Sequence, residues 1–195
     1  MSSIKASKDA LRKEIGARIQ QLGNEEKTLQ SNKVVQKLFA LPAFRNSNRI
    51  SVYLSTENEI NTENIVREIF ALNKKCYVPR YNRQVMEMVR LNDMKDWENL
   101  PLTKWKIKQP LLSERRENAT DTGGLDLIII PGVAFTRDGK RLGHGAGYYD
   151  KYQTDLFQKH SLRPTTIGVA FKEQILDDVP VQDNDVALDI VLFAD

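Results

Sequence analysis

The chain has 195 residues, of which 41% are apolar and 28% are charged, a balance typical of a soluble globular domain. Its longest apolar run, near residues 127–131, is too short to span a bilayer, and the N-terminus has no apolar signal-peptide core. A single cysteine, Cys76, excludes an internal disulfide framework and fits a reducing compartment. We therefore expect a cytoplasmic protein without a membrane partner.

The net charge of +3 is unevenly distributed along the chain. Residues 1–48 contain nine Lys or Arg and four Asp or Glu, a charge of +5, which leaves −2 for the remainder. A basic face of this kind could meet an anionic ligand, although a solvated helix surface is the better interpretation for most of these residues. No RNP motif, zinc finger or helix-turn-helix pattern is present, so we expect no nucleic-acid partner.

The first half of the chain alternates helical and strand patterns. Apolar residues recur at helical spacing over residues 7–22, with Ser7 as the expected N-cap. A second helix begins at Glu25 and is expected to stop at Pro42, because proline cannot continue a helix. The elements that follow are a strand at 49–55, a helix at 61–73 capped by Asn61 or Thr62, and strands at 75–81 and 86–91.

The second half opens with a polar, irregular excursion and then returns to the sheet. Residues 92–124 show no periodicity, and we expect Trp97, Trp105 and Pro110 to anchor them. The near-continuous apolar run at 125–131 predicts a strand buried on both faces of a parallel sheet. The remaining elements are a helix near 147–160 and closing strands at 165–171 and 189–195. This alternation predicts a single α/β domain over the whole chain (1–195), with a mostly parallel sheet between two layers of helices.

The most unusual stretch is RLGHGAGYYD, residues 141–150, in which three glycines alternate with other residues. It lies between a strand and a helix of the α/β pattern, where the N–H groups of a helix N-terminus favour an anion. Glycines would let the backbone approach phosphate oxygens, and Arg141 would add a charged fork. Neither a P-loop nor a Rossmann GxGxxG motif is present. The alternative is a tight turn that its tyrosines pack against a strand.

Other constellations of reactive residues are sparse. No HExxH, CxxC or GxSxG motif exists, so neither a zinc site nor a serine nucleophile is indicated. Cys76 fits a small core residue better than a nucleophile, and His160, near a helix end, is expected at the surface. Oxygen ligands for magnesium could come from Asp150 and from the acidic stretch 183–189, although most acids in such a run are merely solvated.

Several longer segments carry a family pattern. The strongest reads LDLIIIPGVAFTRDGKRLGHGAGYYDKY, residues 125–152. The others are KDALR at 8–12, YLSTENEINTENI at 53–65, VPRY at 78–81, QP at 109–110 and NDVALD at 184–189. Together they resemble the 5-formyltetrahydrofolate cyclo-ligase family, also called 5,10-methenyltetrahydrofolate synthetases, and come nearest to its animal and fungal members. Every fixed position of the strongest signature is present. The chain departs from the family pattern at His144, Ala146, Asn184 and the terminal LFAD.

The resemblance implies an ATP- and magnesium-dependent enzyme that converts 5-formyltetrahydrofolate to 5,10-methenyltetrahydrofolate and releases ADP and phosphate. Transfer of the γ-phosphoryl group to the formyl oxygen would make that oxygen a leaving group, and N10 of the substrate would then attack. Since ATP and substrate supply the reacting groups, the protein would mainly orient them and neutralise charge. The alternative is a non-catalytic folate- or nucleotide-binding protein.

Carried over by position, the resemblance also assigns residues to each part of the site. It places Arg141 and Tyr148 in catalysis, and Asp150 and Asp185 at magnesium. The residues assigned to ATP are Lys8, Asp9, Ala10, Leu11, Arg12, Arg141, Leu142, Gly143, His144, Gly145, Ala146, Gly147, Tyr148 and Tyr149. The residues assigned to folate are Leu54, Glu59, Arg80, His144, Gly145, Ala146, Gly147 and Tyr148. The expected substrate is 5-formyltetrahydrofolate, with or without a polyglutamate tail, bound by a monomer.

Overall fold

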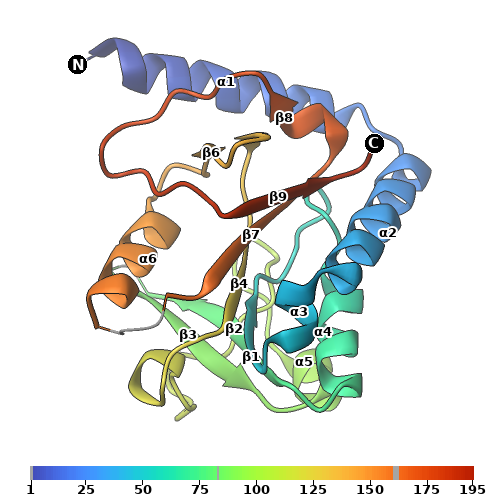
Figure 1. Cartoon of the computed structure of the whole chain (residues 1–195), viewed down its shortest axis with the longest axis vertical. Coiled ribbons are helices and arrows are strands. Elements are labelled where there is room, and N and C mark those ends of the chain that lie inside the picture. Colours follow the sequence, from blue (N-terminus) through green and yellow to red (C-terminus); the bar gives the residue numbers. More distant parts are fainter. Residues whose placement is uncertain (1, 83, 160–162) are drawn as a thin grey trace.

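A six-stranded sheet in the order β3-β2-β1-β4-β7-β9 forms the centre of the computed structural model (Figure 1), which describes residues 2–82, 84–159 and 163–195. His160, expected at the surface, lies outside the described residues. The strands are β1 (Arg49–Val52), β2 (Lys75–Tyr81), β3 (Met86–Leu91), β4 (Leu127–Ile130), β7 (Thr165–Ala170) and β9 (Ile190–Phe193). Neighbouring strands pair in parallel except β2 and β3, which are antiparallel. The expected α/β domain with a mostly parallel sheet is confirmed.

The buried strands divide their side chains between two cores, because successive residues of a strand point to opposite faces of the sheet. In β4, Leu127 and Ile129 join the core on one face. Ile128 and Ile130 join the core on the other face. All four are completely buried, which explains why this strand reads as a continuous apolar run rather than as an alternating one.

Helices cover both faces of the sheet and give the three expected layers (Figure 1). One core takes side chains from α2 (Asn24–Ala40), α3 (Pro42–Asn46) and α4 (Glu63–Ala71), and the other takes them from α6 (Tyr148–Lys159). The first helix, α1 (Ser2–Gln20), buries Ile15 and Ile19 in the first core and crosses the top of Figure 1. None of the helices in the described ranges is long and apolar enough to cross a membrane.

Several boundaries differ from the sequence-based expectation. Because α1 begins at Ser2, Ser7 is not an N-cap but lies inside the helix, where its hydroxyl donates to the Ser3 carbonyl oxygen (2.9 Å). Pro42 follows the end of α2 as expected, but it also opens α3, since proline is tolerated in the first turn of a helix. The prediction that Trp105 anchors its segment is wrong, because 69% of that residue is exposed.

A second, three-stranded sheet in the order β6-β5-β8 is missing from the sequence-based prediction. Its strands are β5 (Ala134–Thr136), β6 (Arg141–Leu142) and β8 (Ile175–Leu176). They are only two or three residues long and carry no readable periodicity. This small sheet matters because the glycine loop (residues 143–147) starts directly after β6, and not after the long apolar strand β4.

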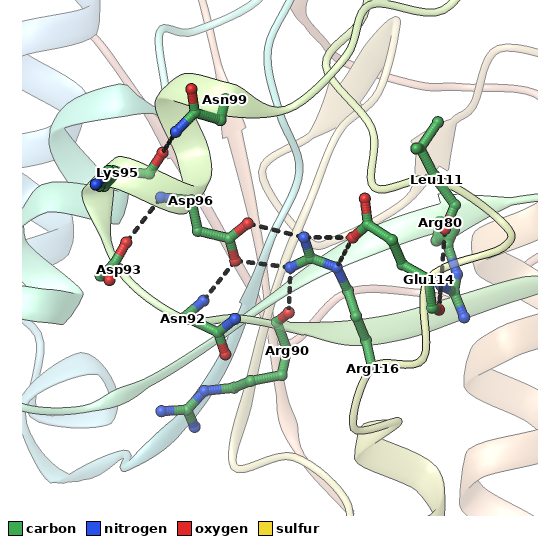
Figure 2. Close-up of polar contacts among 10 residues, drawn as sticks. All are labelled: Arg80, Arg90, Asn92, Asp93, Lys95, Asp96, Asn99, Leu111, Glu114 and Arg116. Carbon is green, nitrogen blue, oxygen red and sulfur yellow. Dashed lines mark hydrogen bonds and ion pairs between the residues drawn. The ribbon is translucent and has the colours of Figure 1, made fainter.

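The outer segment (residues 92–124) is fixed largely by polar contacts. It contains α5 (Met94–Asn99) and the short 3-10 helix η1 (Ala119–Asp121). Figure 2 shows Arg116 at its centre, with both ends of the guanidinium 2.7 Å from Asp96 and with Nε 2.6 Å from Glu114. The hydrogen bonds from Arg116 hold the pKa of Asp96 below its ordinary value. Charge-assisted, bidentate hydrogen bonds of this kind are stronger than hydrogen bonds between neutral groups, so they hold the outer segment in one conformation.

The strand order places a topological switch point between β1 and β4. The chain winds from β1 to β2 and β3 on one side, and from β4 to β7 and β9 on the other. In open α/β sheets, ligands bind in the crevice beyond the carboxyl ends of the strands at such a point. Here those ends lead into residues 53–60 after β1 and residues 131–133 after β4. The fold therefore indicates where a site should lie.

Candidate functional site

A cleft of about 310 Å³ opens at the switch point. Its walls come from α1, from the segments that follow β1 and β4, from the glycine loop and from η2 (Lys172–Gln174). The lining residues are Arg12, Ile15, Gly16, Ile19, Gln20, Asn58, Glu59, Gly132, Val133, His144 and Gln174. The fold thus brings together Arg12, Glu59 and His144, three residues assigned from the sequence that lie far apart in the chain.

A buried ion pair closes the base of the glycine loop. Nη2 of Arg141 lies 2.8 Å from Oδ2 of Asp150, and the two side chains are 4% and 14% exposed. Nη1 of Arg141 donates to the Pro131 carbonyl oxygen (3.2 Å), and Oδ1 of Asp150 accepts from the Val186 N–H (3.1 Å). Nε of Arg141 is buried without a hydrogen-bond partner among the described residues. The pair therefore ties the loop to both β4 and the late acidic segment.

The loop needs glycine for two separate reasons. Gly145 and Gly147 have φ values of 109° and 70°, in the left-handed region that other residues rarely adopt. At Gly143, a Cβ would lie 2.8 Å from Nη1 of Arg141, so the packing of the guanidinium excludes a side chain. Residues 144–147 are exposed, and within the described residues their N–H groups have no backbone acceptor. Such a run of N–H groups beside the N-terminus of α6 suits an anion.

The first helix brings two cations to this region. Nε of Arg12 donates to the Gly143 carbonyl oxygen (2.9 Å), and its Nη1 pairs with Asp9 (2.6 Å). One turn earlier, Nζ of Lys8 lies 2.5 Å from Oδ2 of Asp185, and Lys8 is only 8% exposed. Because the two cations are four residues apart, they share one face of α1, as the sequence predicts.

Glu59 projects from the opposite wall. Its Oε2 accepts from the N–H (2.8 Å) and the hydroxyl (2.9 Å) of Thr56, and its Oε1 lies 3.4 Å from Nε2 of His144. Burial raises the pKa of this carboxyl, but the hydrogen bonds from His144 and Thr56 outweigh it, so the net pKa lies below its ordinary value. Glu59 is therefore ionised at neutral pH and can accept hydrogen bonds from a ring that carries N–H donors.

Tyrosines pack together directly after the glycine loop. The ring of Tyr81 packs against Tyr148, with 5.1 Å between the centroids and 57° between the planes. Burial raises the pKa of Tyr81 to about 12. Tyr149 is 6% exposed, and its hydroxyl has no hydrogen-bond partner among the described residues. Tyr81 was not assigned to the site from the sequence, although it ends the matched segment VPRY, and its ring contact with Tyr148 places it next to the glycine motif.

The other assigned residues occupy the framework or the rim of the site. Leu54 is 7% exposed and belongs to the core beside β1, while Leu142 is buried within β6. On α1, Leu11 packs against the core and Ala10 is exposed. None of these four residues lines the cleft, so a direct contact of each with a ligand stays a prediction.

The two carboxylates assigned to magnesium each lie beside a cation assigned to ATP. Asp150 pairs with Arg141, and Asp185 pairs with Lys8. No three His, Cys, Asp or Glu side chains gather around a common metal position within the described ranges. Two separate carboxylates still fit Mg²⁺, which is commonly held by one or two carboxylates together with substrate phosphates and water.

Comparison with known proteins decides the family. The model of the 5-formyltetrahydrofolate cyclo-ligase family matches residues 4–194. The chain belongs to this family. A 5-formyltetrahydrofolate cyclo-ligase from Mus musculus is 43% identical over 99% of this chain and 96% of the mouse protein. A probable 5-formyltetrahydrofolate cyclo-ligase from Caenorhabditis elegans is 38% identical over 99% of this chain and 95% of its own length.

Solved structures agree with this cyclo-ligase assignment. A 5,10-methenyltetrahydrofolate synthetase from Aquifex aeolicus superposes with a TM-score of 0.76 at 28% identity, over 95% of this chain and 88% of that protein. A 5,10-methenyltetrahydrofolate synthetase from Mycoplasma pneumoniae has a TM-score of 0.72 at 23% identity, over 95% of this chain and 98% of that protein, and shares the fold. The family resemblance read from the sequence, and the enzyme class that it implies, are confirmed.

One assigned residue of the cyclo-ligase site binds protein groups of the outer segment. Arg80 is 8% exposed, and its Nη1 donates to the carbonyl oxygens of Leu111 (3.0 Å) and Glu114 (2.8 Å), as Figure 2 shows. Its Nε and Nη2 bind Oε2 of Glu87 at 3.1 and 2.9 Å. A direct contact between Arg80 and folate stays a prediction, whereas its hold on the outer segment is in place.

Proposed function

We propose that this protein is an ATP-dependent 5-formyltetrahydrofolate cyclo-ligase, which forms 5,10-methenyltetrahydrofolate and releases ADP and phosphate. The observation that carries the proposal is the family match over residues 4–194, joined to one cleft that collects Arg12, Glu59 and His144. The basic, glycine-lined edge of this cleft suits the phosphates of ATP. The ionised carboxylate of Glu59 suits the N–H donors of a pterin.

The chemistry needs little covalent help from the protein. The formyl oxygen is a poor leaving group because the N5 amide is stabilised by resonance. When this oxygen attacks the γ-phosphorus, the bond to ADP breaks and an imidate phosphate forms. N10 then attacks the formyl carbon and loses its proton, the C–O bond breaks, and phosphate leaves with the former formyl oxygen. The N5–C–N10 bridge of the product remains. Orientation and charge neutralisation therefore dominate catalysis.

The cations around the glycine loop would take the phosphate charge. Arg141 offers a planar fork that matches phosphate oxygens, and Lys8 and Arg12 approach from α1. Asp150 and Asp185 would hold Mg²⁺. A bound Mg²⁺ supplies positive charge next to the transferred phosphoryl group. Tyr148 would line the folate beside Tyr81.

A single absorbance assay tests the proposal. The methenyl product absorbs in the near ultraviolet, so the purified protein is mixed with 5-formyltetrahydrofolate, ATP and Mg²⁺ while product is recorded. We expect product only when all three are present, together with one ADP for each product formed. Product formed without ATP, or ATP hydrolysed without product, would contradict the proposal.

A non-catalytic folate- or nucleotide-binding protein is the alternative. It predicts saturable binding of folate or ATP in the same cleft with no methenyl product. The retention of Lys8, Arg141 and Asp150 in one connected arrangement favours the enzyme, because a pure binder has no need to neutralise a transferred phosphoryl group.

We also propose that the enzyme acts as a monomer in the cytoplasm and accepts polyglutamylated substrate. Sedimentation at micromolar concentration tests the oligomeric state, and cell fractionation tests the compartment. Turnover of mono- and pentaglutamyl substrates under the same conditions tests the effect of the tail.

A further inference from the structure

The side chain of Gln109 holds both main-chain groups of Tyr81. The Tyr81 N–H donates to Oε1 of Gln109 (3.0 Å), and Nε2 of Gln109 donates to the Tyr81 carbonyl oxygen (3.2 Å). Tyr81 is the last residue of β2, and β1 pairs with β2 only as far as Tyr77. Gln109 therefore supplies the hydrogen bonds that a neighbouring strand would supply at this position.

The residue held in this way contacts the glycine motif. Tyr81 packs on Tyr148 of the glycine motif, and Tyr148 donates from its hydroxyl to the Asn82 carbonyl oxygen (3.3 Å). A shift in the backbone of Tyr81 would thus move Tyr148, which the family resemblance assigns to folate, while the Lys8 and Arg12 side chains would stay where α1 places them.

The segment that carries Gln109 is itself anchored from the same strand. Arg80, next to Tyr81, binds the carbonyl oxygens of Leu111 and Glu114. The carboxylate of Glu114 binds Arg116, which in turn binds Asp96 (Figure 2). Neighbouring residues of β2 thus grip the outer segment on either side of Pro110. The position of the outer segment is therefore coupled to that of β2.

We propose that Gln109 is a positioning residue of the folate pocket, which fixes Tyr81 and through it Tyr148, and that Arg80 supports it by holding the same segment. The inference rests on the proposed function for the identity of the ligand. The outer segment would then contribute to folate binding through its hydrogen bonds to β2. Arg80 would contribute indirectly, in addition to its predicted contact with folate.

The test compares Gln109→Met with wild type. Methionine keeps the length of the side chain but can bind neither main-chain group of Tyr81. We expect faster hydrogen exchange of the Tyr81 amide by NMR, a Kd for 5-formyltetrahydrofolate raised about tenfold by titration, and a smaller loss of affinity for ATP than for folate. Gln109→Glu retains an acceptor for the Tyr81 N–H and loses the donor, so its folate Kd should lie between the two.

Ser47→Ala is the control. Ser47 is also buried (6% exposed) and also binds the main chain, since its hydroxyl donates to the Ala43 carbonyl oxygen (2.6 Å), but it precedes β1 and so lies at the opposite end of that strand from the cleft. This change should lower Tm without changing the folate Kd. An unchanged Tyr81 amide in Gln109→Met, an unchanged folate Kd, or an equal loss of ATP affinity would overturn the inference. Absence of turnover in the wild type would count against the proposed function alone, because the exchange and binding measurements need no turnover.

Discussion

Arg141 and Asp150 stand at the two ends of the glycine motif and bind each other across it, 2.8 Å apart and almost fully buried. Lys8 and Asp185 repeat the arrangement at 2.5 Å, and the N–H of Val186, next to Asp185, donates to Asp150. Each pair joins a cation assigned to ATP phosphate with a carboxylate assigned to magnesium. In the proposed MgATP complex, each cation would turn to a phosphate oxygen and each carboxylate to the metal, so every charge would exchange one opposite charge for another. None of these charges would be left buried and unpaired, which would cost several kcal/mol.

Arg141→Lys is the first prediction from this arrangement. Lysine keeps the charge but cannot reach Asp150 and the Pro131 carbonyl with a planar fork. We expect kcat/KM for ATP to fall by an amount equivalent to about 1–3 kcal/mol of transition-state stabilisation. The free energy of unfolding, followed through Tm, should fall by less. Rates are divided by the folded fraction, and Arg18→Lys, in an exposed pair with Glu14, is the control. Near-normal turnover per folded molecule with a large loss of Tm would favour the packed-turn interpretation.

Asp150→Asn tests the metal assignment. Asparagine preserves the shape and can still accept from the Val186 N–H, but it removes the charge that pairs with Arg141. We expect the Mg²⁺ concentration for half-maximal rate to rise at least tenfold, because a neutral amide is a much weaker ligand for a hard cation. The measurement is a Mg²⁺ titration of initial rates at fixed ATP. An unchanged midpoint would show that Asp150 does not hold the metal.

Glu59→Gln should change both folate affinity and the pH dependence of stability. The folded-state pKa of Glu59 is lowered, so its stabilising contribution is complete above the ordinary value of 4.5 and is lost as the pH falls through the lower folded value. The Tm difference between wild type and Glu59→Gln should therefore shrink as the pH falls below 4.5. At neutral pH the folate KM should rise about tenfold, while exposed Glu57→Gln changes neither quantity. A Tm difference independent of pH would contradict this account.

The sheet was readable from the sequence because its strands are buried and its helices amphipathic. The run at 127–130 and the helical spacing of Ile15 and Ile19 each reflect burial that local pattern reports directly. The pairing of Lys8 with Asp185 has no such local signal, since it depends on how α1 crosses the carboxyl ends of the strands. The partners of Gln109 and Arg80 were hidden for the same reason, because an aperiodic segment gives no register from which contacts could be inferred.

Gly145→Val examines the glycine loop itself. Gly145 has φ of 109°, and a Cβ there would meet the guanidinium carbon of Arg12 at 3.6 Å, an ordinary contact. Backbone strain rather than a clash should therefore dominate, at about 1–3 kcal/mol for a β-branched residue. We expect ATP affinity to fall with the loop conformation, and folate affinity measured without ATP to fall less. Titration of each ligand separately checks this. A loss of folate binding alone would show that the loop binds folate and not ATP.

Gly16→Ala tests whether position 16 is glycine for ligand binding and not for the stability of α1. Gly16 lies well inside α1, where glycine is about 0.8–1.0 kcal/mol less favourable than alanine. An added Cβ would have nothing within 4 Å, so the packing of the protein does not require glycine here. The residue lines the cleft together with Asn58 and Glu59, so we expect the open space to receive the pterin. Alanine should therefore raise Tm by about 2–4 °C and still weaken folate binding, and Gly16→Leu should weaken folate binding further.

Ala17→Gly is the control, because Ala17 is exposed and does not line the cleft. This change should lower Tm and leave the folate KM unchanged. Thermal melts and folate KM on the same three variants decide the matter. If Gly16→Leu binds folate as the wild type does, no ligand packs against this turn of α1.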